Sequence, residues 1–225
     1  MIFSGHQPNF LPYMGFFYKM VKSDVFVLDD DVQYSHGEWH NSNFIKLAGK
    51  KSRITVPVSY DFGDAINQVE ICYARDWKKK LLRSVKMYYA RAAHAEEGIE
   101  LIERHLMADY ELLAELNIAL ITEIAERFGI EAKLLVASVD MPTKLKNNDR
   151  NIHQCWLAGA DTYYSGNGGR AYNDEQAYEK AGIKIVYTDY EPVVYQQTKG
   201  DFIENLSVLD YILNNGFVLP KEWKR

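Results

Sequence analysis

Side chains that exchange protons or hydrogen-bond a ligand are densest in the first part of the chain. His6, Gln7 and Asn9 follow a short apolar start, in a segment broken by prolines. A histidine directly after a strand can act as a general base, or it can only hydrogen-bond its own turn. We predict that His6 is catalytic and that Gln7 and Asn9 orient the substrate.

Three adjacent carboxylates, Asp29, Asp30 and Asp31, close a second apolar run. They repel one another unless a cation or hydrogen-bond donors lie among them. Since neighbouring strand residues point to opposite faces, either Asp29 and Asp31 or Asp30 alone can face one ligand. We predict that Asp30 and Asp31 are catalytic residues that position the substrate, or a Mg²⁺ ion bound together with a nucleotide. For each of the three, a helix cap or a solvated acid is the alternative.

Residues 39–46 combine an aromatic side chain with amides and a lysine, which predicts a recognition loop with an aromatic platform. Tyr13 is a further candidate for stacking on a sugar or a base, with ordinary packing at the core's edge as its alternative. His36 and His40 are four residues apart, but no HExxH pattern surrounds them, so no metal site is predicted there. The predicted binding residues of the loop are Trp39, Asn41, Asn43 and Lys46.

A strand-like segment at 162–165 runs into a glycine-rich loop before a helix. Glycines allow the backbone to approach a ligand, and the amides of such a loop can hold an anion. The spacing matches neither GxGxxG nor a Walker loop, so an ordinary connection is the alternative. The predicted binding residues here are Tyr164, Ser165, Gly166, Gly168, Gly169, Arg170 and Tyr172.

Two smaller polar groups complete the candidates. Tyr195 and Gln197 are predicted to hydrogen-bond the ligand, with a polar turn as the alternative. Lys144, Lys146 and Arg150 follow another strand-like segment, and we expect them to form a solvated basic loop.

Composition places the chain among globular proteins, since 47% of its 225 residues are hydrophobic and 25% are charged. A net charge of -5 disfavours binding of nucleic acid through a broad basic face. Cys72 and Cys155 show neither zinc-finger spacing nor a disulfide framework, which fits a reducing compartment. Without a recognisable signal peptide or membrane-spanning apolar stretch, we expect a cytoplasmic protein, with a homodimer as one option for its oligomeric state.

The elements that must position these residues begin with a strand, a helix and a strand within residues 1–28. Residues 43–58 read as a β-hairpin with a glycine in its turn. Apolar residues spaced three or four apart then predict a helical block over 75–128.

Strands and helices alternate from residue 134 onward, which is typical of a parallel sheet. We therefore predict an α/β fold with a mainly parallel, Rossmann-like sheet and flanking helices. Residues 1–225 are expected to form a single domain, with a helical insertion at about 75–130.

Taken together, these residues resemble the WbqC-like protein family. The similar blocks occur in the family's order along nearly the whole chain. One position departs from the pattern, because Ser42 stands where the resemblance leads us to expect an arginine, and a phosphate or carboxylate contact of that arginine cannot be carried over. The blocks are His6-Gln7-Pro8-Asn9, Leu11-Pro12 with Gly15, residues 24–33, Trp39 with Asn41 and Asn43, Thr55-Val56-Pro57-Val58, Tyr164-Ser165-Gly166, Tyr195 with Gln197, and residues 206–210 before Gly216.

The resemblance implies a role in the biosynthesis of O-antigen or another surface polysaccharide. Members of the family occur with genes for such polymers, and transfer of glycine or another acyl group to a sugar is suggested for one branch. We therefore expect a transferase that places an aminoacyl or acyl group on a nucleotide-linked amino sugar. The alternatives are a non-catalytic protein that binds a sugar nucleotide or glycan, and an ATP-dependent amide ligase.

In each of these three cases we expect a small-molecule ligand. Ligands of α/β proteins bind beyond the carboxyl ends of the strands. We predict that His6, Asp30 or Asp31, Asn41 and the Gly168-Gly169 turn border one pocket. A position of His6 on the opposite side of the sheet from the glycine-rich loop would contradict this arrangement.

Overall fold

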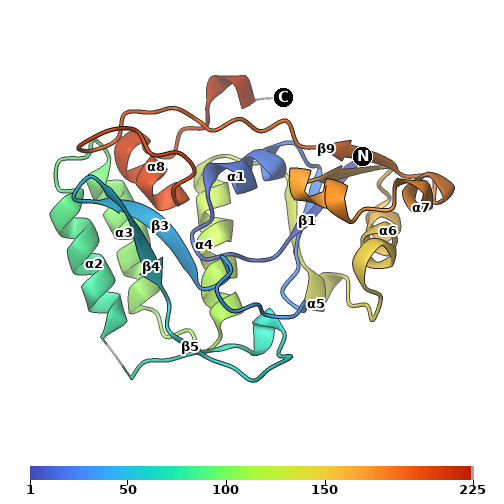
Figure 1. Ribbon diagram of the computed structural model, residues 1–225, viewed down its shortest axis with the longest axis horizontal. Helices are drawn as coiled ribbons and strands as arrows, with labels where there is room; N and C mark the ends of the chain where they lie inside the picture. The colour runs from blue at the N-terminus through green and yellow to red at the C-terminus, as the bar shows by residue number, and fades with distance from the viewer. Residues whose placement is uncertain (75, 224–225) are drawn as a thin grey trace.

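A parallel sheet of five strands forms the centre of the computed structural model, which describes residues 1–74 and 76–223 (Figure 1). The strands are β1 (Ile2–His6), β2 (Val25–Leu28), β7 (Lys133–Val136), β8 (Thr162–Ser165) and β9 (Lys184–Tyr187). They lie in the order β7-β2-β1-β8-β9, and every neighbouring pair is parallel. The predicted mainly parallel α/β sheet is confirmed.

Helices cover both faces of the sheet, because its central strands are apolar on both sides. In β2, Phe26 and Leu28 belong to one hydrophobic core, and Val25 and Val27 belong to the other, as the two-residue repeat of a strand requires. The helices of the larger core are α1 (Met14–Val21), α2 (Trp77–Tyr88), α3 (Ala95–Met107), α4 (Leu113–Arg127) and α8 (Val208–Asn215). Those of the smaller core are α5 (Ala137–Asp140), α6 (Asn147–Ala158) and α7 (Glu175–Lys180).

The predicted helical block corresponds to α2, α3 and α4, which precede β7 in the chain. The predicted hairpin is formed by β3 (Ser42–Leu47) and β4 (Lys50–Thr55), with both turn residues, Ala48 and Gly49, at positive φ. Short elements complete the fold, namely β5 (Val58–Ser59), β6 (Glu70–Ile71) and the 3₁₀ turns η1 (Ile66–Gln68), η2 (Asn167–Ala171) and η3 (Lys221–Trp223). Within residues 1–74 and 76–223, no helix has the length and apolar character needed to cross a bilayer.

The direction of the strand order reverses between β1 and β8. The chain leaves β1 toward α1 on one face of the sheet and leaves β8 toward α7 on the other face. In open parallel sheets, two connections that diverge in this way leave a crevice beyond the carboxyl ends of the strands, and ligands bind there. The residues that follow β1, β2 and β8 are therefore the first place to look for a functional site.

Candidate functional site

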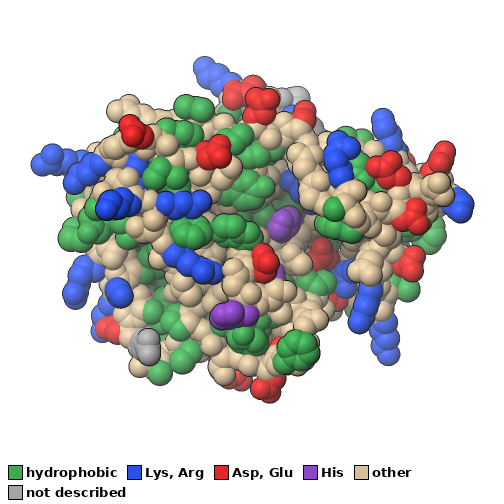
Figure 2. Space-filling view, viewed as in Figure 1, with side chains coloured by type: hydrophobic (Ala, Val, Ile, Leu, Met, Phe, Trp, Pro, Cys, Tyr) green, Lys and Arg blue, Asp and Glu red, His purple; other side chains and the backbone are tan. Residues whose placement is uncertain are grey.

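A cleft of about 640 Å³ opens at this reversal of the strand order. Figure 2 shows a hollow near the middle of one face of the molecule, with a histidine side chain inside it. The carboxyl ends of β1, β2 and β8 contribute to the cleft, together with α1 and the first turn of α6. Its polar lining includes His6, Gln7, Lys19, Asp29, Asn147, Arg150, Asn151, Ser165 and the Gly166–Gly169 turn.

His6 is the last residue of β1 and lines this cleft. Its Nδ1 lies 3.0 Å from the carbonyl oxygen of Gln7, and because a carbonyl can only accept, Nδ1 carries the proton. Burial, followed by the nearby charge of Lys19, lowers the pKa of His6 to about 4. The imidazole is therefore neutral near pH 7, and the lone pair of its Nε2 can accept a proton.

Lys19 is a buried cation on α1 that the sequence prediction did not include. Its side chain is only 6% exposed and lines the cleft, and its ammonium donates to the carbonyl oxygen of Gly5 over 2.7 Å. Burial lowers the pKa of Lys19 to about 8, although the charge of Asp29 opposes this shift. An ammonium has three donors, so Gly5 leaves two of them for a ligand.

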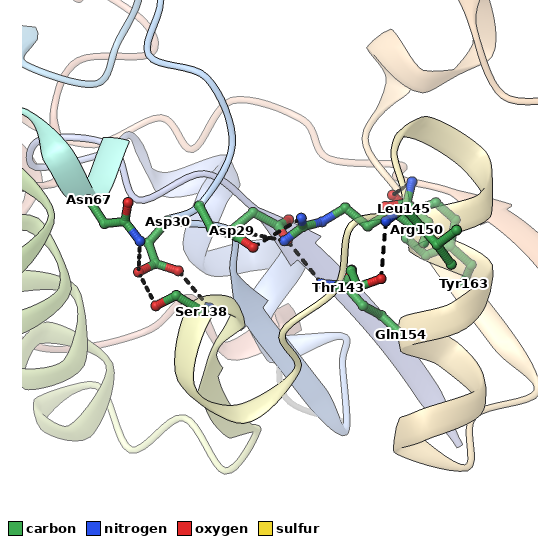
Figure 3. A network of polar contacts seen from close by, with 11 residues as sticks. Asp29, Asp30, Asn67, Ser138, Thr143, Leu145, Arg150, Gln154 and Tyr163 are labelled. Atoms are coloured by element: carbon green, nitrogen blue, oxygen red, sulfur yellow. Dashed lines mark hydrogen bonds and ion pairs between the residues drawn. The ribbon is translucent and has the colours of Figure 1, made fainter. Parts of the chain in front are cut away.

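Arg150 connects the first turn of α6 to the acidic run after β2 (Figure 3). Its guanidinium donates to Asp29 over 3.0 Å and contacts both carboxylate oxygens of Asp31. The expectation of a solvated Arg150 was wrong, because its side chain is buried against these two carboxylates. Asp29 lines the cleft, whereas Asp31 is absent from the lining. Burial raises the pKa of Asp29, and the charge of Arg150 opposes that rise.

Asp30 points away from Asp29, as Figure 3 shows, and it does not line the cleft. Its carboxylate accepts hydrogen bonds from the backbone N–H of Ser138 at 2.9 Å, the hydroxyl of Ser138 at 2.6 Å and the side-chain amide of Asn67 at 3.2 Å. The two donors of Ser138 hold the start of α5 against the end of β2, and Asn67 holds η1 to the same carboxylate. The structure thus assigns Asp30 a structural role in place of the predicted catalytic one.

The glycine-rich turn after β8 borders the cleft. Ser165, Gly166, Gly168 and Gly169 all line it. At Gly169 a Cβ atom would lie 2.2 Å from the hydroxyl oxygen of Ser165, so a larger residue there would force the side chains of Ser165 and Asn173 to move. At Gly166 and Gly168 a Cβ atom would meet nothing within 4 Å, so these two positions face open space.

The aromatic and basic candidates near this turn divide between two sides. Tyr13 and Tyr172 line the cleft, whereas Tyr164, which neighbours Ser165 on β8, points to the opposite face of the strand and does not line it. The guanidinium of Arg170 lies over the ring of Tyr187 at 4.0 Å, outside the cleft lining. The structure therefore brings Tyr13 and Tyr172 to the site, but not Tyr164 or Arg170.

Two predicted binding amides donate to backbone carbonyl oxygens, and one of them, Asn43, holds the turn that follows His6. The amide of Asn43 donates to the carbonyl oxygens of Phe10 and Leu11, over 3.2 and 2.7 Å. Asn41 donates to the carbonyl oxygen of Val56 over 2.9 Å and does not line the cleft. Asn41 therefore does not border the pocket with His6, contrary to the predicted arrangement.

The predicted binding residues Lys46, Tyr195 and Gln197 belong to a separate polar cluster. The ammonium of Lys46 donates to Gln197 over 3.2 Å and to the carbonyl oxygen of Asp201 over 2.6 Å. Tyr195 donates to the buried carboxylate of Asp210 over 2.7 Å. The contacts of Lys46 fasten the segment before α8 to β3, and Tyr195 fastens that segment to α8 itself. Lys46, Tyr195 and Gln197 do not line the cleft.

The carboxylates of the predicted Mg²⁺ position already have partners within the protein. The guanidinium of Arg150 lies between Asp29 and Asp31, and Asp30 is surrounded by hydrogen-bond donors. Across residues 1–74 and 76–223, no cluster of three or more His, Cys, Asp or Glu side chains is arranged to bind a metal ion. The donor set at Asp30 and Asp31 does not fit Mg²⁺.

Comparison with known proteins gives a match to the model of the WbqC-like protein family over residues 7–220. The chain is also 32% identical over 218 residues to the uncharacterized protein Rv1507c of Mycobacterium tuberculosis (strain ATCC 25618 / H37Rv). That similarity covers 95% of this chain and 94% of the mycobacterial protein. Lys19, Asp29, Arg150 and the glycine-rich turn lie inside the range matched by the family model, and His6 directly precedes it.

The buried histidines should make the fold sensitive to mild acid. His40 is 3% exposed and burial lowers its pKa from 6.5 to about 4, so between these values the unfolded state binds more protons and the free energy of unfolding falls as the pH falls. We expect a loss of about 2 kcal/mol from His40 between pH 7 and pH 5. Urea unfolding at both pH values measures this loss of unfolding free energy. The loss should be absent in His40→Gln and retained in His36→Gln, which alters an exposed histidine. An equal loss in both variants would contradict the assignment.

Asp30 should behave as a structural residue. We expect Asp30→Ala to lower the free energy of unfolding by about 3 kcal/mol, because three donors lose a charged acceptor. Glu100→Ala, which removes an exposed carboxylate from α3, should leave the urea midpoint nearly unchanged. A stable Asp30→Ala protein would restore the catalytic interpretation of Asp30.

Proposed function

This chain belongs to the WbqC-like protein family, and we propose that it is an enzyme that transfers an aminoacyl or acyl group to the amine of a nucleotide-linked sugar. We place this activity in the cytoplasm, in the biosynthesis of an O-antigen or another surface polysaccharide. One observation carries the proposal: a neutral histidine and a buried ammonium face the same cleft, at the end of the sheet where nucleotides bind in related architectures.

We assign the diphosphate of the substrate to the part of the cleft that α6 and the glycine-rich turn line. The first turn of a helix has amide N–H groups without acceptors inside the helix, and its dipole favours an anion. Asn147, Arg150 and Asn151 bring this end of α6 to the cleft, while Gly166 and Gly168 leave the backbone of the turn accessible. Arg150 is already paired with Asp29 and Asp31, so amides contribute more to anion binding here than net charge does.

In the proposed reaction, the sugar amine attacks the carbonyl carbon of an activated acyl donor. A carbon–nitrogen bond forms, and the bond between that carbon and the donor's leaving group breaks. Nε2 of His6 accepts the proton that the amine loses and returns it to the leaving group. The donors of Lys19 that Gly5 leaves unused stabilise the negative charge on the carbonyl oxygen during attack.

One observation favours a second candidate, a sugar-nucleotide-binding protein without catalysis. A base with a pKa of about 4 has a small driving force for proton transfer near pH 7. This candidate predicts saturable binding of a sugar nucleotide and no product with any acyl donor. An ATP-dependent ligase would differ from both, since it would consume ATP and release pyrophosphate.

Replacement of the proposed base gives the direct test. We expect His6→Gln to lower kcat about 100-fold with little change in KM, because the base acts only in the transition state. A thermal-shift screen of sugar nucleotides selects the substrate, and mass spectrometry of the acylated product measures turnover. His36→Gln, at an exposed histidine, serves as the control. Full turnover in His6→Gln would remove the base assignment, and binding without turnover in the native protein would favour the second candidate.

The pH dependence of kcat/KM should report Lys19. The proposed mechanism needs a protonated Lys19, whose pKa is about 8, and a neutral His6, whose pKa is about 4. We therefore expect kcat/KM to be constant between pH 4 and pH 8 and to fall about tenfold per pH unit above pH 8. Lys19→Arg keeps the charge at high pH, so its alkaline loss should disappear relative to the native protein. Ionisation of the substrate amine cancels in this comparison, and identical profiles for the two proteins would exclude Lys19 from the reaction.

A further inference from the structure

A second cavity of about 430 Å³ adjoins the cleft and shares His6 and Tyr13 with it. Its other lining residues are Asn9, Pro12, Trp39, Asn43, Lys51 and Asn205. Resting on the proposed function, we propose that this side cavity binds the sugar ring of a nucleoside-diphosphate sugar. The nucleotide and diphosphate then occupy the larger cleft, and the bound molecule passes His6 where the two cavities meet.

Trp39 supplies an apolar surface suited to a sugar ring. Its side chain is 46% exposed, although a large aromatic residue normally gains stability by burial. One edge is supported by Phe44, whose ring centroid lies 5.9 Å away in an edge-to-face arrangement. An indole that is held in place and left open inside a cavity offers a platform for the C–H face of a hexose.

The polar groups of the side cavity suit uncharged hydroxyls. Asn205 and Lys51 are exposed side chains in the lining, and none of the residues that line this cavity is an aspartate or glutamate. The side-chain oxygen of Asn9 is buried without a hydrogen-bond partner. A half-turn of this amide exchanges its oxygen and nitrogen at little steric cost and would present the acceptor to a hydroxyl. Amides and an ammonium together provide donors and acceptors without a fixed negative charge.

Tyr13 forms a fixed wall where the two cavities meet. The ring of Tyr13 contacts Tyr190 edge-to-face with centroids 5.7 Å apart. It also covers Gly15 so closely that a Cβ atom at Gly15 would lie 2.3 Å from the ring. Tyr13 is therefore held at the junction by Gly15 and Tyr190, and a ligand that spans both cavities must run beside Tyr13 and His6.

The test compares each nucleoside diphosphate with its sugar-linked form by isothermal titration calorimetry. The probe pairs are UDP with UDP-glucosamine, dTDP with dTDP-glucose, and GDP with GDP-mannose. For the pair that binds, the ratio of the two Kd values measures the contribution of the sugar. We expect Trp39→Ala to reduce this ratio about tenfold and to leave the Kd of the nucleoside diphosphate unchanged.

Two further variants examine the polar side of the cavity. Asn205→Gly removes the amide without strain, since Asn205 has a φ of 53°, which glycine adopts readily. Lys51→Ala is matched by Lys50→Ala, because adjacent strand residues point to opposite faces and Lys50 does not line the cavity. Asn205→Gly and Lys51→Ala should lower the sugar contribution, and Lys50→Ala should not.

The outcomes separate this inference from the proposed function. If a sugar nucleotide binds but its sugar contribution is absent, or is unchanged in Trp39→Ala, the sugar subsite is overturned and the proposed function stands. An equal loss of affinity for both members of a pair would also overturn it, because Trp39 would then contact the nucleotide. If no probe of any pair binds to the native protein, the proposed function and the sugar subsite fall together.

Discussion

The buried backbone after β1 is the constraint on which the site depends. Residues 8–11 have no strand partner and yet are buried, so their polar groups need other acceptors and donors. Asn117 of α4 donates to the carbonyl oxygen of Pro8, and Ser207 before α8 donates to that of Leu11. Asn43 of the hairpin supplies the donors for Phe10 and Leu11. Three distant segments thus meet at the turn that follows His6.

The same turn explains why the site has two connected parts. It separates the crevice at the strand reversal from the smaller cavity beside the hairpin, so His6 and Tyr13 belong to both. Around His6 the charges are balanced, with Lys19 and Arg150 opposite Asp29 and Asp31. Burial, aided by the charge of Lys19, keeps the imidazole neutral.

Most of the fold could be predicted from the sequence, because short apolar runs and three- or four-residue spacing are local signals. The end of β1 and the glycine-rich turn were recognisable for the same reason, since both follow such runs. The partner of each polar side chain could not be predicted. Asn41, Asn43 and Lys46 have the chemistry of ligand contacts, but their partners are carbonyl oxygens from other parts of the chain. Lys19 was overlooked, although a single cation in an apolar helix was a usable signal.

The hydroxyl of Ser207 and the carbonyl of Leu11 are 196 residues apart in sequence. β1 also pairs with β8, about 160 residues further along the chain, so contacts of high sequence separation define the centre of the sheet. Such contacts form late and slow the folding of a domain. During synthesis the turn after β1 must wait, with its carbonyls solvated, until nearly the whole chain has left the ribosome. Ligand-binding competence should consequently be among the last properties a nascent chain acquires, after its helices are already formed.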